Sequence, residues 1–141
     1  MRSLLSATLL GLLGIVAGCS ESDKGPPKVG ISGKVVNKGT PLALESKGPP
    51  GSSKVELSFW PVGPDGKVPT VANPTFAIVK DDGTFKVDGG IPTGKYKVVI
   101  HQWNPFPNND ILKGKFSKEK SSVVEDITGE KTLDLDVSTL K

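Results

Sequence analysis

The sequence contains one cysteine, one histidine and one arginine in 141 residues. Because Cys19 has no second cysteine to pair with, an internal disulfide is excluded, and an unpaired cysteine needs another explanation. A Ser–His–Asp triad would have to use His101. The only arginine, Arg2, stands at the N-terminus, so the rest of the chain lacks the side chain best suited to bidentate phosphate recognition. We therefore expect no enzyme, no cofactor and no metal site.

The chain also has little excess of either charge. It contains seventeen lysines and fifteen acidic residues, and without Arg2 the formal net charge falls from +3 to about +2. The lysines are spread along the chain instead of forming a basic patch. A small, evenly distributed positive charge does not predict a nucleic-acid partner.

The first eighteen residues have the pattern of an export signal. One basic residue, Arg2, precedes an uncharged apolar run too short for a comfortable transmembrane helix. The run ends in Val16-Ala17-Gly18-Cys19, where small residues fit a peptidase cleft and the thiol can receive a diacylglyceryl group. This resembles the bacterial lipobox, with valine in place of the more frequent leucine. The alternative is a plain secretory leader followed by an incidental cysteine.

Three segments follow from this interpretation. Residues 1–18 are predicted to be a cleaved lipoprotein signal peptide. Residues 19–28 are the lipidated cysteine and a flexible, polar tether that contains Gly25-Pro26-Pro27. Residues 29–141 are long enough for one domain. The expected location is the cell membrane or the outer membrane, on the periplasmic or surface face, with the membrane as a partner through the lipid.

Apolar residues in the third segment alternate with a period of two, as in half-buried antiparallel strands. Seventeen glycines and twelve prolines leave no window for a long helix. Asp82-Gly83 is the best hairpin signal, because both residues tolerate a positive φ. The predicted strands are 29–37, 54–61, 75–81, 84–88, 94–102, 120–127 and 131–137. The sequence therefore predicts an all-β fold, an antiparallel sandwich of about seven strands, prealbumin-like or immunoglobulin-like.

Several motifs occur in an order that resembles carboxypeptidase regulatory-like domains, and in particular small lipoproteins of planctomycete-type bacteria. They are Gly33-Lys34-Val35-Val36, Gly39-Thr40-Pro41-Leu42, Val55–Phe59, Asp81–Phe85, Ile91–Val98, Lys115–Ser117 with Ser121-Ser122, and Leu133–Leu135. The resemblance implies a transthyretin-like sandwich without catalytic activity. The loop Pro41–Ser53 is longer than the family's usual connection. Hydroxyisourate hydrolases of related fold use several histidines and an arginine, which this chain lacks.

Most of these motifs have a structural explanation. Gly83 permits a tight turn with positive φ, and Pro92 and Gly94 shape the entry to the next strand. Tyr96 can bury its ring while its hydroxyl reaches a backbone group. Asp134 and Asp136 could offer oxygen ligands to calcium, but a solvated strand face explains them better.

The loop His101–Lys118 is the best candidate for a binding site. Trp103 and Phe106 stand among prolines and the amides of Asn104 and Asn108. Flat aromatic rings flanked by amides suit a sugar ring or a protein partner. The alternative is that both rings fold back to cover one end of the sandwich. The sequence thus predicts a lipid-anchored, non-catalytic structural or interaction module, or alternatively a glycan- or peptide-binding module, with an envelope protein or glycan as partner.

Overall fold

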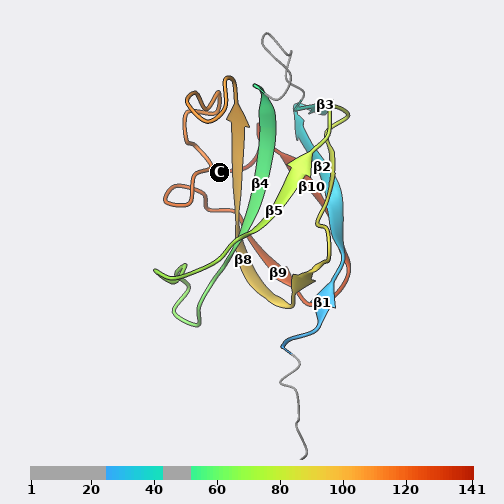
Figure 1. Cartoon of the computed structure of the whole chain (residues 1–141), viewed down its shortest axis with the longest axis vertical. Coiled ribbons are helices and arrows are strands. Elements are labelled where there is room, and N and C mark those ends of the chain that lie inside the picture. Colours follow the sequence, from blue (N-terminus) through green and yellow to red (C-terminus); the bar gives the residue numbers. More distant parts are fainter. Residues whose placement is uncertain (1–24, 43–51) are drawn as a thin grey trace, which may run out of the picture.

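The computed structural model describes residues 25–42 and 52–141 (Figure 1). The predicted signal peptide, Cys19, most of the tether and most of the loop Pro41–Ser53 lie outside the described residues. The described part contains strands and turns but no α-helix, and hence no helix that could cross a membrane. Its strands are β1 (Lys28–Val29), β2 (Ile31–Asn37), β3 (Thr40–Pro41), β4 (Lys54–Pro61), β5 (Thr75–Val79), β6 (Thr84–Lys86), β7 (Ile91–Pro92), β8 (Gly94–Trp103), β9 (Val124–Ile127) and β10 (Lys131–Asp136).

These strands form a curled main sheet in the order β10-β2-β6-β5-β4-β8-β9, with β3 paired to β2 and a small separate pair, β1 and β7. The predicted all-β sandwich class is confirmed. The predicted strand 120–127 begins later, at Val124. The reason is Ser121, whose buried hydroxyl donates to the carbonyl of Val98 at 2.6 Å before the regular ladder starts.

The core lies where the sheet curls over itself. Alternate residues of β4 and β8, such as Leu57 and Ile100, are fully buried and directly opposite each other. Each such side chain stabilises the fold by roughly 1.5–3 kcal/mol relative to leaving it exposed. The largest fully buried side chains are Phe59, Phe116, Ile31, Leu57, Ile91, Ile100 and Ile127.

One strand pair departs from the prediction of an antiparallel sandwich. β2 and β10 run parallel, with Gly33 opposite Leu133. Parallel neighbours need a long connection, and here almost the whole domain lies between them. Alternation within each strand cannot reveal this pairing, because the same apolar pattern serves either direction. At this point the strands approach so closely that a Cβ on Gly33 would overlap the backbone carbonyl of Leu133.

The sandwich has two distinct ends. β1 pairs with β7 through Lys28 and Pro92, just before β8 begins at Gly94. β8 then runs for ten residues, which is about 30 Å, to Trp103. We call the end with β1 and β7 the tether end and the end with Trp103 the distal end (Figure 1). The described chain therefore enters the domain at the end opposite to the predicted binding loop.

Candidate functional site

The last residues of β8 and the first residues of β4 form the floor of the distal end. His101 lies opposite Glu56, and Trp103 lies opposite Lys54. Because side chains two residues apart in a strand share a face, these four side chains project from the same side of the sheet. Pairing of β4 with β8 therefore places one imidazole, one indole and an ion pair, Lys54 to Glu56 at 2.6 Å, side by side.

Three aromatic rings pack together here, and we call His101, Trp103 and Phe106 the distal aromatic cluster. The rings of His101 and Trp103 stack with centroids 4.7 Å apart and planes 22° from parallel. Phe106 meets Trp103 edge-on, at 5.9 Å and 83°. The ammonium of Lys54 sits 3.8 Å from the centre of the Phe106 ring, a cation–π contact. The cluster is therefore held together by its own packing.

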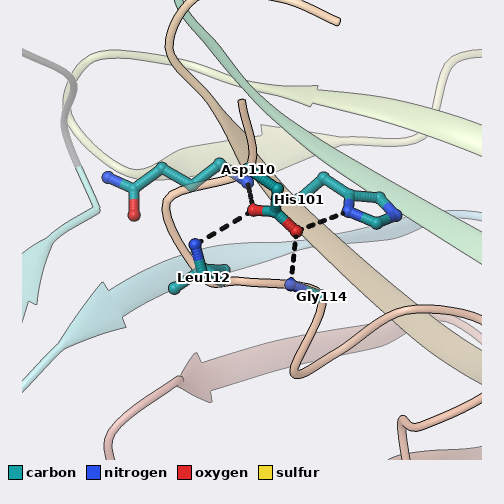
Figure 2. A network of polar contacts seen from close by, with 5 residues as sticks. His101, Asp110, Leu112 and Gly114 are labelled. Atoms are coloured by element: carbon teal, nitrogen blue, oxygen red, sulfur yellow. Dashed lines mark hydrogen bonds and ion pairs between the residues drawn. The ribbon is translucent and has the colours of Figure 1, made fainter. Parts of the chain in front are cut away.

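Asp110 fastens the loop that carries Phe106 (Figure 2). Its carboxylate is 2.9 Å from Nδ1 of His101 and accepts backbone N–H groups of Gln102, Leu112 and Gly114 at 3.0–3.1 Å. Partial burial raises the pKa of Asp110, but these hydrogen bonds outweigh burial, with the His101 contact contributing most, and hold the pKa below its usual value. Asp110 is thus ionised at neutral pH and closes a turn, and the sequence prediction had not singled it out.

The predicted binding residues occupy different positions in this loop. Asn104 accepts a hydrogen bond from the Ser53 hydroxyl at 3.3 Å through its side chain. Its backbone carbonyl accepts from Asn109 at 2.7 Å. Asn108 is exposed, and its backbone N–H donates to Pro105. The structure brings Trp103, Phe106 and Asn104 to one end of the molecule, whereas the side chain of Asn108 makes no hydrogen bond to them.

Access to the rings differs. His101 covers one face of the Trp103 indole, and Phe106 contacts the indole edge-on. Trp103 is therefore half-buried, and its neighbours in the cluster cover part of its ring. Phe106 is 42% exposed and is the most accessible ring of the cluster. The indole N–H of Trp103 and the hydroxyl of Ser52 are buried, with no hydrogen-bond partner among the described residues. A ligand at this end would meet Phe106 first.

Metal ligands do not gather anywhere in residues 25–42 and 52–141: no three His, Asp or Glu side chains there are placed to hold an ion. Asp134 is exposed. Asp136 is engaged instead as a cap, since its carboxylate accepts the N–H groups of Lys38 and Gly39 and the hydroxyl of Ser138. These hydrogen bonds, those of Ser138 first, hold the pKa of Asp136 below its usual value.

Two surface hollows among the described residues lie away from the cluster. One of them, about 480 Å³, is lined by residues at the starts of β2 and β10, such as Ser32 and Lys131, and by Lys86 at the end of β6. Another of about 370 Å³ lies near Val62 and Lys95. Both are shallow and open to solvent, and neither is lined by an aromatic ring, as the distal end is.

A second surface feature escaped the sequence prediction. Phe76 and Ile78 on β5 are 55% and 72% exposed, whereas the smaller Ala77 and Val79 point into the core. Strand alternation predicted β5 but not which face is buried, because both faces are apolar. The available signal was the run Val68–Val79, which contains no charged residue.

No model of a known protein family matches this chain, and no curated protein matches it. Among solved structures, the chain is similar to a DUF3823 family protein from Parabacteroides merdae ATCC 43184, with a TM-score of 0.45 and 20% identity. The alignment covers 79% of this chain and 46% of that one, so this chain spans about half the length of that protein. The likeness is weak, and no property of that protein is carried over.

Proposed function

We propose that the chain is an exported lipoprotein, acylated at Cys19, whose β-sandwich is a non-catalytic interaction module on the cell envelope. The observation that carries the proposal is the sequence Val16-Ala17-Gly18-Cys19 at the end of an uncharged apolar run, with no other cysteine in the chain. Two or three acyl chains give the stable membrane attachment that a single chain does not.

The layout of the domain supports this proposal. The chain enters at the tether end, where Lys28 pairs with Pro92. Nine residues lie between Cys19 and Val29, a reach of about 30 Å when extended. With the tether end toward the bilayer, the distal aromatic cluster would lie further from the membrane by the length of β8. A lipid at Cys19 would therefore present the loop His101–Lys118 to the space beyond the membrane.

Metabolic labelling with an azide-bearing fatty acid tests the anchor. We expect the wild-type protein to be labelled and to sediment with membranes, and the Cys19→Ser variant to lose both properties. Ser20→Ala serves as the matched control, since it changes a neighbour without removing the thiol. If the wild-type protein stays unlabelled, or if Cys19→Ser remains with the membrane fraction, the proposed anchor is wrong.

The proposal of a non-catalytic module rests on His101. Among the hydrogen bonds of the described residues, its ring has one partner, Asp110, and it is stacked on Trp103. No hydroxyl or thiol is hydrogen-bonded to it there, as nucleophilic catalysis requires. We expect wild type and His101→Ala to hydrolyse a panel of p-nitrophenyl esters at the same background rate. A loss of activity specific to His101→Ala would contradict the proposal.

Exposure of Phe106 supports a second candidate function, a glycan- or peptide-binding module at the distal end. Aromatic rings beside amides are suited to sugar rings and to peptide side chains. A glycan array and a peptide array probed with wild type and Phe106→Ala test it. Ile111→Ala is the control, because Ile111 is an exposed apolar residue of the same loop. Binding that Phe106→Ala abolishes and Ile111→Ala retains supports this function; equal signals from all three proteins contradict it.

A further inference from the structure

The excess of positive charge in the domain is gathered in one segment of the chain. Residues 97–120 carry five lysines and two carboxylates, whereas the other described residues carry ten lysines and ten carboxylates. The rest of the described domain is therefore neutral, and the whole excess belongs to β8 and the loop that follows it. Because single lysines also occur all along the chain, the sequence prediction did not find this local excess.

Four of these lysines lie in the segment Lys113–Lys120, which we call the basic loop. Lys113, Lys115 and Lys120 are exposed, and Lys118 is half-buried. The backbone follows consecutive turns, in which the N–H groups of Lys113, Lys115 and Lys120 donate to carbonyl oxygens three residues earlier, at 2.9–3.1 Å. Since such turns advance about 2 Å per residue, the backbone of all four lysines lies within roughly 15 Å. The charges are therefore close together.

The basic loop is held against the part of the β8 edge that β9 leaves free. The carbonyl of the buried Phe116 accepts the N–H of Ile100 at 3.2 Å. The ammonium of Lys97 on β8 donates to the carbonyl of Lys118 at 3.3 Å. Figure 1 shows this segment beside β8, on the flank of the sheet away from β2. Because the loop is already fixed, a ligand there does not have to order it first.

Carboxylates do not neutralise the ammonium groups of the basic loop. None of its four lysines forms an ion pair with a carboxylate of the described residues, whose ion pairs involve other side chains. Lys118 lies 4.2 Å from the centre of the Trp60 ring instead, and Lys115 lies 4.7 Å from that of Phe116. A cation–π contact leaves the positive charge in place. The acidic residue of the loop, Glu119, leaves three of the four charges in excess.

Trp60 supplies a flat ring next to this charge. It lies on β4 opposite Lys97, and its indole N–H donates to the buried hydroxyl of Ser58 at 3.1 Å, which fixes the ring. Trp60 is half-buried, so part of the ring stays accessible beside the ammonium of Lys118. An apolar ring next to a cation suits a uronic-acid residue, which has an apolar sugar face and a carboxylate.

We propose that the basic loop binds an acidic polysaccharide, whose uronate carboxylates accept the ammonium groups of the lysines while a sugar ring contacts Trp60. Nucleic acid fits these residues less well, because the described chain has no arginine for bidentate contacts to phosphate. A bilayer fits less well, because its phosphates form a plane whereas the charge is confined to one loop. The inference rests neither on acylation of Cys19 nor on Phe106.

Polygalacturonate is the probe, and fully methyl-esterified polygalacturonate is its uncharged match. Full-length protein in a polyoxyethylene detergent is titrated with each polymer in a calorimeter, without calcium. We expect the acid to bind at least about tenfold more tightly than the ester, and its affinity to fall at least about threefold between about 50 mM and about 200 mM salt. Equal affinities, or no binding, overturn the proposal. Polyglutamate, single-stranded DNA or phosphatidylglycerol vesicles that bind at least as tightly as polygalacturonate also overturn it.

Matched double variants locate the contact. Lys113→Gln with Lys120→Gln should lower the affinity for polygalacturonate at least about fivefold, because two exposed charges leave the basic loop. Lys34→Gln with Lys86→Gln removes the same net charge from exposed positions on β2 and β6 and should change the affinity less than about twofold. Circular dichroism confirms that both variants are folded. Equal losses in the two variants mean that only net charge matters and overturn the proposal.

Tryptophan fluorescence distinguishes this site from the distal aromatic cluster. Polygalacturonate should change the emission of the wild-type protein, since a carboxylate on Lys118 alters the field at the Trp60 ring. Trp60→Phe keeps Trp103 as the remaining indole and should lose most of this change. Binding to Trp60→Phe with an undiminished change in emission would place the polymer at Trp103 and overturn the proposal. Failure of the proposal would leave the membrane anchor untouched, because labelling and sedimentation measure the anchor separately.

Discussion

The imidazole of His101, near the end of β8, and the carboxylate of Asp110, nine residues further along the chain, lie 2.9 Å apart. The same carboxylate accepts three backbone N–H groups, so one side chain joins the strand to the loop that follows. The distal aromatic cluster depends on the hydrogen bonds of Asp110, because Trp103 stacks on the His101 ring that Asp110 contacts.

Replacing Asp110 should therefore destabilise the distal end. Asp110→Ala leaves three backbone N–H groups and one imidazole without their acceptor, and we expect a loss of about 2 kcal/mol or more in the free energy of unfolding. Urea denaturation measures it. Asp134→Ala is the control, because Asp134 is exposed, and it should change stability by less than about 0.5 kcal/mol. Equal stability of the two variants would show that the Asp110 contacts contribute little.

The lowered pKa of Asp110 predicts a pH dependence with a definite sign. Hydrogen bonds hold this pKa below its value in the unfolded chain, although burial opposes them. The unfolded state therefore takes up the proton first as pH falls, and stability is lost below about pH 4, the usual carboxyl range. Above that range the contribution is fully present. Asp110→Asn should flatten the dependence of unfolding free energy on pH below about pH 4; an unchanged slope would contradict this assignment.

Gly33 should tolerate no side chain. A Cβ at this position would overlap the carbonyl oxygen of Leu133 on the parallel strand β10. Gly33→Ala must push β2 and β10 apart, and we expect a loss of about 3 kcal/mol or more, or failure to fold. Gly129→Ala is the control, since its added Cβ would meet nothing. Thermal unfolding followed by circular dichroism compares the two variants, and similar melting temperatures would rule out a close approach at Gly33.

Tyr96 should contribute through its hydroxyl as well as its ring. The ring is buried, and the hydroxyl donates to the backbone carbonyl of Pro92 at 2.8 Å. Tyr96→Phe keeps the ring and should cost about 1 kcal/mol, the net value of one such hydrogen bond. Urea denaturation is again the measurement. A loss smaller than the experimental error would mean that water replaces the phenol as the partner of Pro92.

Much of the fold was predictable because its signals are local. Alternation and turn residues predicted strands near 54–61, 94–102 and 131–137, close to β4, β8 and β10. The expected role of Tyr96 is confirmed by its bond to Pro92. The parallel pairing of β2 with β10 was not predictable, because partner choice between the first and last long strands depends on contacts far apart in sequence.

The candidate site was predictable only in outline. Aromatic composition drew attention to Trp103 and Phe106, but the residue that fixes their loop, Asp110, has an ordinary sequence context. Its four contacts exist only after the chain turns back on β8. Exposure of Phe76 and Ile78 was equally hidden, since both faces of β5 are apolar and only the surrounding strands decide which one is buried. Whether the Trp103 loop binds a ligand stays a prediction.

The central claim is that a lipid on Cys19 holds the sandwich at a membrane. Intact-mass spectrometry of the protein extracted from native membranes tests it most directly. We predict a chain that begins at Cys19 and carries the additional mass of a diacylglyceryl group, with or without a third acyl chain. A chain that begins at any other residue, or one that begins at Cys19 without added mass, would contradict the claim.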